Sequence, residues 1–532
     1  MASVTLNKKT FEKIGKIDFI EERLGMMGCP VDAVTDKEIL VDVTPNRPDL
    51  LSESGIKRYL LAFLGKEKGL KEYSIKKSDY ELIIEKSVSE VRPYTACAIV
   101  KNLKFDDSKI KEIIDIQEKL HSTFGRNRKK IAIGIYPFDK IKFPIYFKAL
   151  APERIKFQPL EESREMSGSE ILTRTKAGRE YSHLLEGKKL FPVFIDSADN
   201  ILSMPPVINS HWTGKIDEST KDVFIECSGF DYSVLAKTLN ILVTALADMG
   251  GEIYSMKLKY PDKTINSPDL SPEKMKIDID YVNKMLGLKL GEKDLKSLLE
   301  KTGLSYSKEA LIPAYRADII HPIDIVEEIA IAYGYDKFKE EIPQISTIGK
   351  EDDTEILKRK IAEVLAGLGM LETYSYNLTS KEDECKKMSA KSSLVEVPNA
   401  KTNFNVLRAS MLPSMLRILS ENKSADYPQK IFEIGKTFKK LKDIEESDVL
   451  AVALTNSNFT EAKQILEYLA KMLSLELELK KLSHESLIEG RTGKILFNGK
   501  EIGIIGEVSP QVLSNWSLEV PVSVIEINVS KL

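Results

Sequence analysis

Four carboxylates crowd the start of one expected helix: Asp318, Asp324, Glu327 and Glu328. A helix beginning at Pro322 would place the last three at i, i+3 and i+4, on one face. Carboxylate oxygens that converge within one turn suit a hard cation such as Mg²⁺. Acidic residues are also favoured at a helix N-terminus by the helix dipole alone, and the spacing by itself favours this plainer interpretation. The opposite, buried face is expected to hold Ile323, Val326, Ala330 and Tyr333.

A second set of polar groups follows an expected strand that ends in the double proline Pro205-Pro206. Its members carry amide, hydroxyl or carboxyl groups: Asn209, Ser210, Thr213 and Glu226. Such side chains can donate and accept hydrogen bonds to the hydroxyl group of a small molecule, so they could line a pocket. A polar surface loop is the alternative, and composition alone favours it.

Two short basic runs that precede expected strands could contact phosphate groups: residues 126–130, which include Arg126, and residues 176–183, which include His183. Most runs of this kind are solvated surface, so each is a weak signal. The sequence has no P-loop, dinucleotide-binding or nucleophile-elbow motif. Its five histidines do not neighbour Ser or Cys in a way that predicts a nucleophilic triad.

The bulk composition restricts the class of protein. A length of 532 residues predicts three or four domains. Charged residues make up 30% of the chain but nearly cancel, to a net charge of -3, which argues against a strongly basic nucleic-acid binder. Four scattered cysteines predict neither a zinc ribbon nor a disulfide framework. With a polar N-terminus and no apolar run long enough to span a membrane, the chain is expected to be cytoplasmic.

The elements around the acidic cluster repeat an earlier part of the chain. Residues 1–75 and residues 270–342 each read as a helical segment, a short strand, a turn and a further helix. Arg47-Pro48-Asp49-Leu50 of the first copy can be laid over Arg316-Ala317-Asp318-Ile319 of the second. A duplicated small α+β domain is the interpretation we adopt.

The rest of the chain predicts two larger domains. Residues 76–262 alternate strand patterns with helical stripes and indicate a mixed α+β domain, followed by a charged linker over residues 260–276. Residues 345–532 begin with an amphipathic helix and continue as many short strands without a regular βαβ order. A mainly antiparallel sheet is therefore expected there.

Several stretches together resemble one family: VDVTPNRPDLLSESG, MPPVINS, ADIIHPIDIVEEIAIAYGYD, VLRASMLPSMLRILSENK, PQKIFEIG and IIGEVSPQVL. In this order, and nearly end to end, they are similar to the beta subunits of phenylalanyl-tRNA synthetases, in the shorter archaeal/eukaryotic form. The resemblance implies B1-like and B5-like domains at the two copies. It implies a B3/B4-like editing domain between them and a non-catalytic, class II synthetase-like core (B6/B7-like) at the end.

The resemblance also implies roles and partners. ATP-dependent charging of tRNA(Phe) would belong to an alpha subunit, within a heterotetramer of two alpha and two beta chains, because the final core lacks a GxGxxR-like segment. A pocket shaped for phenylalanine rejects tyrosine only weakly, so a second site that hydrolyses Tyr-tRNA(Phe) has a physical purpose. The resemblance assigns this editing pocket to Pro205, Pro206, Asn209, Ser210, Thr213 and Glu226. It assigns tRNA-end contacts to Arg126 and His183, and Mg²⁺ to Asp318, Asp324, Glu327 and Glu328.

Three other functions fit the sequence less well. The chain could be an assembly and tRNA-docking subunit of the same complex whose editing pocket has decayed. It could also be a free-standing nucleic-acid-binding protein, although the lack of a basic excess counts against this. A stand-alone ligase fits least, because no ATP motif is visible.

Overall fold

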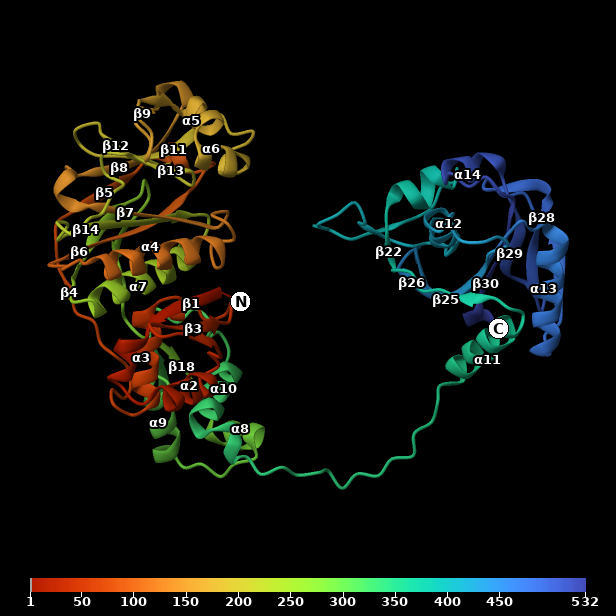
Figure 1. Cartoon of the computed structure of the whole chain (residues 1–532), viewed down its shortest axis with the longest axis horizontal. Helices are drawn as coiled ribbons and strands as arrows, with labels where there is room; N and C mark the ends of the chain where they lie inside the picture. The colour runs from red at the N-terminus through yellow and green to blue at the C-terminus, as the bar shows by residue number, and fades with distance from the viewer. Residues whose placement is uncertain (1) are drawn as a thin grey trace. The chain divides into compact units, whose positions relative to one another are not determined.

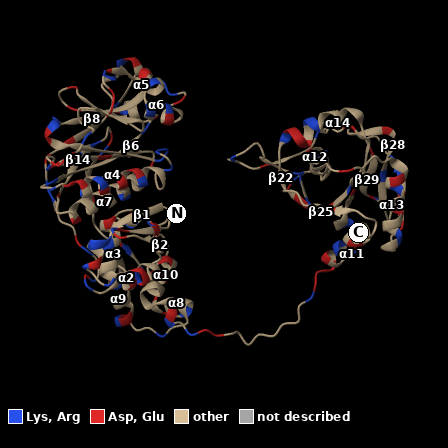
Figure 2. Cartoon of the chain, in the orientation of Figure 1, with Lys and Arg blue, Asp and Glu red and all other residues tan. Residues whose placement is uncertain are grey.

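The computed structural model describes residues 2–532, which form two compact units. One unit ends at Glu341 and the other runs from Ile342 to Leu532. Both mix helices with strands (Figure 1), so the chain has the mixed α+β multidomain fold that its sequence predicts. Lys and Arg are interspersed with Asp and Glu over both units (Figure 2), in keeping with the small net charge. Across residues 2–532, no helix has the length and apolar character needed to cross a bilayer.

The first unit contains two small domains with the same order of elements. Each has a strand, two helices, two further strands and a third helix, and in each three-stranded antiparallel sheet the last strand lies in the centre. The first copy comprises β1 (Ala2–Asn7), α1 (Lys8–Glu12), α2 (Ile17–Met26), β2 (Val31–Val34), β3 (Glu38–Val43) and α3 (Glu53–Phe63). The second comprises β18 (Glu273–Met275), α8 (Ile279–Leu286), α9 (Glu292–Lys301), β19 (Ser305–Ser307), β20 (Glu309–Ile312) and α10 (Pro322–Tyr333).

The third helix of each copy begins in the same way. Ser52 caps α3 by accepting a hydrogen bond from the Gly55 amide, and His321 caps α10 by accepting one from the Ile323 amide. Each cap follows its arginine, Arg47 or Arg316, at the same spacing along the chain. The two helices therefore start at equivalent points relative to the arginines, and α10 begins at Pro322, as expected.

The segment of chain that separates the two copies forms a five-stranded and a seven-stranded sheet. Helices α4 (Asp107–Ser122) and α7 (Tyr232–Asp248) cover one face of the five-stranded sheet, and the seven-stranded sheet packs on its other face (Figure 1). The five-stranded sheet has the order β4 (Ile75–Lys76), β15 (Glu252–Tyr254), β6 (Tyr94–Lys101), β14 (Val223–Gly229) and β7 (Ile131–Pro137). The other has the order β13 (Ile208–Asn209), β12 (Ile201–Met204), β11 (Phe191–Ile195), β8 (Ile145–Leu150), β5 (Glu81–Ile84), β16 (Met256–Lys259) and β17 (Thr264–Ser267).

The expected linker over residues 260–276 is instead partly strand. β17 pairs antiparallel with β16 and closes a hairpin at the edge of the seven-stranded sheet, and β18 belongs to the second copy. The charged and proline residues of this stretch suggested a linker, but residues 264–267 and 273–275 pair in two different sheets. The prediction of a linker was therefore wrong for these two strands.

The second unit is built on a seven-stranded sheet that is antiparallel except at the β21–β25 edge. Its strands are β21 (Leu371–Glu372), β25 (Lys430–Lys440), β26 (Ile444–Thr455), β30 (Val522–Asn528), β29 (Lys500–Val508), β28 (Leu487–Phe497) and β27 (Leu477–Lys481). Helices α11 (Asp353–Gly367) and α13 (Phe459–Met472) pack on one face, and α12 (Leu412–Glu421) and α14 (Pro510–Asn515) pack on the other. The mainly antiparallel arrangement agrees with the expectation from the sequence.

One close approach in the first copy gives a stability prediction. A Cβ at Gly55, near the start of α3, would collide with the Asp49 carbonyl oxygen, whereas a Cβ at Gly25 in α2 meets nothing. We expect Gly55→Ala to destabilise the chain by about 1–3 kcal/mol through overpacking. Gly25→Ala, the matched control, should be neutral or stabilise by up to about 1 kcal/mol. Urea unfolding of the full chain measures both, and equal effects of the two substitutions would contradict the prediction.

Candidate functional site

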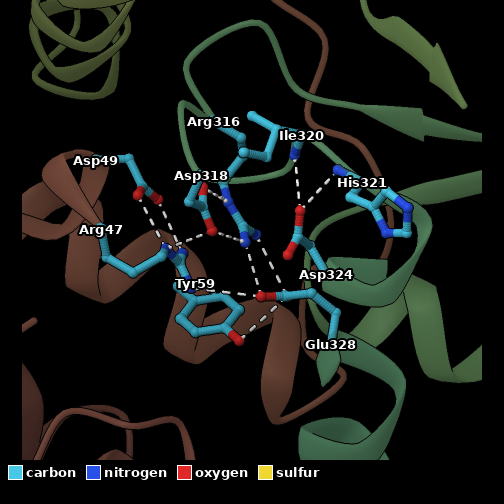
Figure 3. A network of polar contacts seen from close by, with 9 residues as sticks. All are labelled: Arg47, Asp49, Tyr59, Arg316, Asp318, Ile320, His321, Asp324 and Glu328. Atoms are coloured by element: carbon cyan, nitrogen blue, oxygen red, sulfur yellow. Dashed lines mark hydrogen bonds and ion pairs between the residues drawn. The ribbon is translucent and has the colours of Figure 1, made fainter. Parts of the chain in front are cut away.

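The two copies meet at a buried cluster of arginines and carboxylates (Figure 3). Arg47 donates two parallel hydrogen bonds to Asp49, from Nε to Oδ1 and from Nη2 to Oδ2, both 2.9 Å long. Arg316 grips Asp318 in the same way, at 2.8 and 2.7 Å. The two Arg-x-Asp segments that the sequence analysis laid over one another thus make the same fork in each copy. Paired, bidentate contacts of this kind are the strong form of an ion pair.

Glu328 of α10 connects the two forks. Its carboxylate accepts hydrogen bonds from Arg316, the shorter being 2.7 Å from Nη2 to Oε1, and Arg47 Nη1 lies 3.7 Å from the same oxygen. The Tyr59 hydroxyl lies 3.4 Å from the other oxygen of Glu328, and the Tyr59 ring stacks 4.5 Å from the Arg47 guanidinium. Tyr59 and Glu328 come from the third helix of each copy, so the contact joins equivalent helices.

The electrostatics of this cluster follow from its burial. Burial by itself would raise the pKa of Asp318, but the Arg316 guanidinium outweighs it and holds the pKa below its ordinary value. Burial would likewise lower the pKa of Arg47, yet Asp49 and Glu328 raise it well above its ordinary value. Asp318 and Arg47 are therefore charged at neutral pH, and each depends on its partners for compensation.

Of the four acids predicted to bind magnesium, the structure brings only Asp318 and Glu328 together, through Arg316. Asp318 and Glu328 are occupied by arginines, whereas Asp324 accepts hydrogen bonds from the Ile320 and His321 amides at 2.8 and 2.7 Å. Glu327 is exposed. Asp324, Glu327 and Glu328 were expected on the face opposite the core, but Glu328 is buried because α10 directs it toward Arg316. Ile323 is correspondingly exposed rather than buried, and Ile325 and Ile329 take its place in the core.

As they lie, these side chains do not fit a metal site. Within residues 2–532, no group of three or more His, Cys, Asp or Glu side chains is placed to hold a metal ion. The nearest equivalent, the pair of Asp318 and Glu328, already has its charge balanced by the arginines. Magnesium binding at these positions stays a prediction, and no step proposed below depends on it.

A second buried polar cluster lies between the two large sheets of the first unit. Because side chains alternate along a strand, Val223, Ile225 and Cys227 of β14 face the helices, and Glu226 faces the seven-stranded sheet. There the Tyr136 hydroxyl lies 3.1 Å from Glu226 Oε1 and 3.5 Å from Asn209 Oδ1. Two of the predicted pocket residues, Asn209 and Glu226, are therefore brought together through a tyrosine.

The acid in this cluster has no cation bonded to it. Burial raises the pKa of Glu226 to about 8, and the partial offset from Tyr136 and Arg92 does not restore the ordinary value. Arg92, the nearby guanidinium, bonds instead to Ser228, through Nε to Oγ at 3.0 Å and Nη2 to the carbonyl oxygen at 2.6 Å. At neutral pH Glu226 is thus mainly a neutral carboxyl group, which can both donate and accept hydrogen bonds.

The remaining predicted pocket residues serve the local backbone. The Thr213 hydroxyl donates to the Leu202 carbonyl oxygen at 3.3 Å, and Ser210 Oγ accepts a hydrogen bond from the Trp212 amide at 3.3 Å. Pro205 and Pro206 are buried beside them in the turn after β12. These four residues shape the loop that carries Asn209, and their side chains do not meet Glu226 through any hydrogen bond found here.

The basic run at residues 126–130 reaches the same turn through one side chain. Arg128 donates to the Val207 carbonyl oxygen at 3.0 Å, and its guanidinium stacks 4.4 Å from the Tyr181 ring. Arg126 and His183, the predicted tRNA contacts, are both exposed on the segments that Arg128 joins. Their own contact with RNA stays a prediction.

Sequence reasoning missed Tyr136, Arg92 and Arg128 as members of this cluster. Tyr136 read as one more apolar position in the strand IAIGIYPF, and Arg128 was one of several cations in a basic run. A usable signal was present for Tyr136, because Gly134 lies two residues earlier on the same strand face. A glycine at such a place often marks a close approach by another group.

Removing an arginine from the first cluster tests its role. Arg316→Met leaves Asp318 and Glu328 buried with only the more distant Arg47 to compensate their charges. We therefore expect a loss of about 3–5 kcal/mol in the free energy of unfolding. Lys257→Met is the control, because it breaks an exposed pair with Asp79 and should cost less than about 1 kcal/mol. Urea unfolding of the full chain compares the two, and a loss for Arg316→Met as small as that of the control would contradict a compensated buried cluster.

The raised pKa of Glu226 makes a pH-dependent prediction. Between its ordinary value near 4.5 and about 8, folding requires Glu226 to keep a proton, so the stability it contributes is lost as pH rises through that window. Glu226→Gln cannot ionise, and its Tm relative to wild type should rise from pH 5 to pH 9. Glu252→Gln on β15 is the control, because Lys76 lowers the pKa of Glu252 from its ordinary value of 4.5. Its pH dependence lies below that value, so its Tm relative to wild type should stay nearly constant from pH 5 to pH 9. A Tm difference for Glu226→Gln that does not change with pH would contradict a neutral buried acid.

Comparison with known proteins agrees with this architecture. The family model of the tRNA synthetase B5 domain matches residues 275–335, and that of the phenylalanyl tRNA synthetase beta chain CLM domain matches residues 339–529. Phenylalanine–tRNA ligase beta subunits from Thermococcus kodakarensis and Pyrococcus horikoshii are 40% and 43% identical. The alignments cover 100% and 91% of this chain, and 99% and 89% of those proteins.

A solved structure matches the first unit. It is an N-terminal fragment of the phenylalanyl-tRNA synthetase beta subunit from Pyrococcus horikoshii, with 40% identity and a TM-score of 0.60. The match covers 62% of this chain and 99% of the fragment. With relatives this similar aligned over nearly their whole length, the chain belongs to the family of phenylalanine–tRNA ligase beta subunits.

Proposed function

We propose that this chain acts in a phenylalanine–tRNA ligase complex, where it supports the charging of tRNA(Phe) and hydrolyses tRNA(Phe) that carries tyrosine. The observation that carries the editing role is the buried cluster of Tyr136, Glu226 and Asn209 between the two sheets. A neutral carboxyl and an amide in a desolvated place are suitable partners for the phenol that distinguishes tyrosine from phenylalanine.

The energetics of this cluster favour such a choice. A site built to hydrogen-bond a hydroxyl group rejects the analogue without it, because the buried polar groups would then be unsatisfied. Burial keeps Glu226 largely neutral, so its carboxyl group can donate a hydrogen bond to the phenol oxygen as well as accept one from the phenol. Phenylalanine on the tRNA would gain none of these bonds. Hydrolysis itself needs a water held beside the ester, with help from the tRNA terminus, rather than a protein nucleophile.

The surroundings of the cluster suit an RNA end. Arg126, Lys129 and Lys130 are exposed on the loop that Arg128 ties to the turn after Pro206. Cations placed next to a buried polar cluster would meet the phosphates of a strand whose terminal aminoacyl group enters between the sheets. Arg126 and His183 are the residues we propose to contact the tRNA.

The second unit is proposed as a class II synthetase-like scaffold that does not charge tRNA itself. Its seven-stranded sheet carries helices on both faces, and the sequence lacks the arginine segment that such enzymes use for ATP. ATP and phenylalanine would then be bound by an alpha subunit. The proposed assembly is a cytoplasmic heterotetramer of two alpha and two beta chains.

A second candidate function is favoured by one observation. Five of the six predicted pocket residues are buried, and Asn209 is only partly exposed, so the cluster is closed in this structure. A subunit whose pocket has decayed into ordinary core would look similar. In that case the chain would serve assembly and tRNA docking without hydrolysis.

Deacylation kinetics separate these candidates. We expect the complex of this chain with its alpha subunit to hydrolyse Tyr-tRNA(Phe), and Asn209→Ala to slow hydrolysis about tenfold or more, because a buried hydrogen-bond partner is lost. Charging with phenylalanine should be unchanged. Asn266→Ala, on the exposed edge strand β17, is the matched control and should hydrolyse at the wild-type rate. A wild-type complex that charges phenylalanine but leaves Tyr-tRNA(Phe) intact would contradict editing and favour the docking subunit.

A further inference from the structure

We propose that Tyr136 is a specificity-determining residue of the editing site, whose own phenol occupies the place that the phenol of a tyrosyl group must take. The pocket is then closed until a tyrosyl group displaces it. This inference rests on the proposed editing function and deepens it, because it says how the closed cluster can still serve as a pocket.

The contacts of Tyr136 are those a tyrosyl ligand would need. Its hydroxyl lies 3.1 Å from Glu226 Oε1 and 3.5 Å from Asn209 Oδ1. The ring folds back along its own strand and places its hydroxyl over Gly134, where any Cβ would collide with it. Gly134 stands directly opposite Glu226 in the pairing of β7 with β14. The glycine therefore provides the space in which a phenol meets the buried acid.

The cluster also has unused capacity for hydrogen bonding. Glu226 Oε2 and Ser203 Oγ are buried and have no partner of acceptable geometry among the residues that the structure describes. Ser203 pairs with Asn209 across β12 and β13, so both unsatisfied groups border the Tyr136 hydroxyl. Buried polar atoms in a finished core are nearly always bonded, and exceptions deserve a functional explanation. These groups could bond a ligand that enters when Tyr136 leaves.

Exchange of one phenol for another explains the selectivity. Displacing Tyr136 breaks its hydrogen bonds to Glu226 and Asn209, which opposes opening for every ligand equally. A tyrosyl group restores the bonds, whereas a phenylalanyl group cannot. Since a ligand shifts a conformational equilibrium only by its differential affinity, the open state is populated for tyrosine and not for phenylalanine. Tyr136 thus protects correctly charged Phe-tRNA(Phe) from hydrolysis.

The decisive variant is Tyr136→Phe, which keeps the ring and removes the competing hydroxyl. In the complex with the alpha subunit, hydrolysis of Tyr-tRNA(Phe) and Phe-tRNA(Phe) would be measured for wild type and variant. A tyrosyl group already fills the wild-type pocket, so easier opening gives it no further gain, whereas a phenylalanyl group now enters more often. We therefore expect Phe-tRNA(Phe) hydrolysis to rise and the tyrosine-over-phenylalanine ratio to fall about fivefold. Tyr146→Phe, on β8 of the seven-stranded sheet, is the matched control and should leave the ratio unchanged.

The alternatives give different results. An unchanged ratio for Tyr136→Phe would overturn this inference while leaving the editing function intact. Slower hydrolysis of Tyr-tRNA(Phe) with no gain for Phe-tRNA(Phe) would also overturn it, because Tyr136 would then bind the substrate in place. A wild-type complex that hydrolyses neither substrate would overturn the proposed function, and this inference with it.

A second measurement does not depend on activity. Tyr136→Ala leaves a space beside Glu226 and Asn209 with the shape of the lost side chain. We expect p-cresol to raise the Tm of this variant in the complex, toluene to raise it much less, and neither to affect wild type. Equal shifts with p-cresol and toluene in Tyr136→Ala would contradict a phenol-recognising site.

Discussion

The first unit depends on charges that can be buried only in pairs. Arg47 and Arg316 each pair with a carboxylate of their own copy. Glu328 pairs with both arginines and so links the two copies. Such a cluster adds little net stability compared with apolar packing. Any other arrangement of the two copies would, however, leave a buried charge without its partner. The cluster therefore fixes how the two copies dock. Because the middle domain is inserted in the chain between them, the same cluster fixes where that domain begins and ends.

Other contacts extend this constraint toward the cluster of Tyr136, Glu226 and Asn209. Arg58 of α3 bonds Asp248 at the end of α7 at 2.8 Å, and Asn240 of α7 donates to the Ala314 carbonyl oxygen of the second copy at 3.1 Å. Helix α7 in turn covers the sheet that holds Glu226. The two buried acids, Glu328 and Glu226, then differ for a physical reason. The first is bonded to arginines, whereas the second faces a phenol and an amide and is largely neutral, as suits recognition of a hydroxyl group.

The sequence allowed prediction wherever the signal was local. Proline at the start of α10, the repeated Arg-x-Asp segment and the strand patterns around Glu226 each depend on neighbouring residues alone. The direction of Glu328 could not be predicted, because it is decided by Arg47, which lies far away in the chain and in the other copy. Tyr136 was missed for a similar reason. Alternation marked it as an apolar strand position, and only the packing of a second sheet reveals that its hydroxyl meets Glu226.

The most direct test is a structure of the complete complex with a non-hydrolysable analogue of the tyrosylated tRNA 3′ end. The account predicts that the phenol of the analogue lies within hydrogen-bonding distance of Glu226 and Asn209, between the two sheets. Tyr136 should be displaced from its position over Gly134. An analogue bound elsewhere, with Tyr136 still bonded to Glu226, would contradict both the location of the editing site and the exchange of phenols.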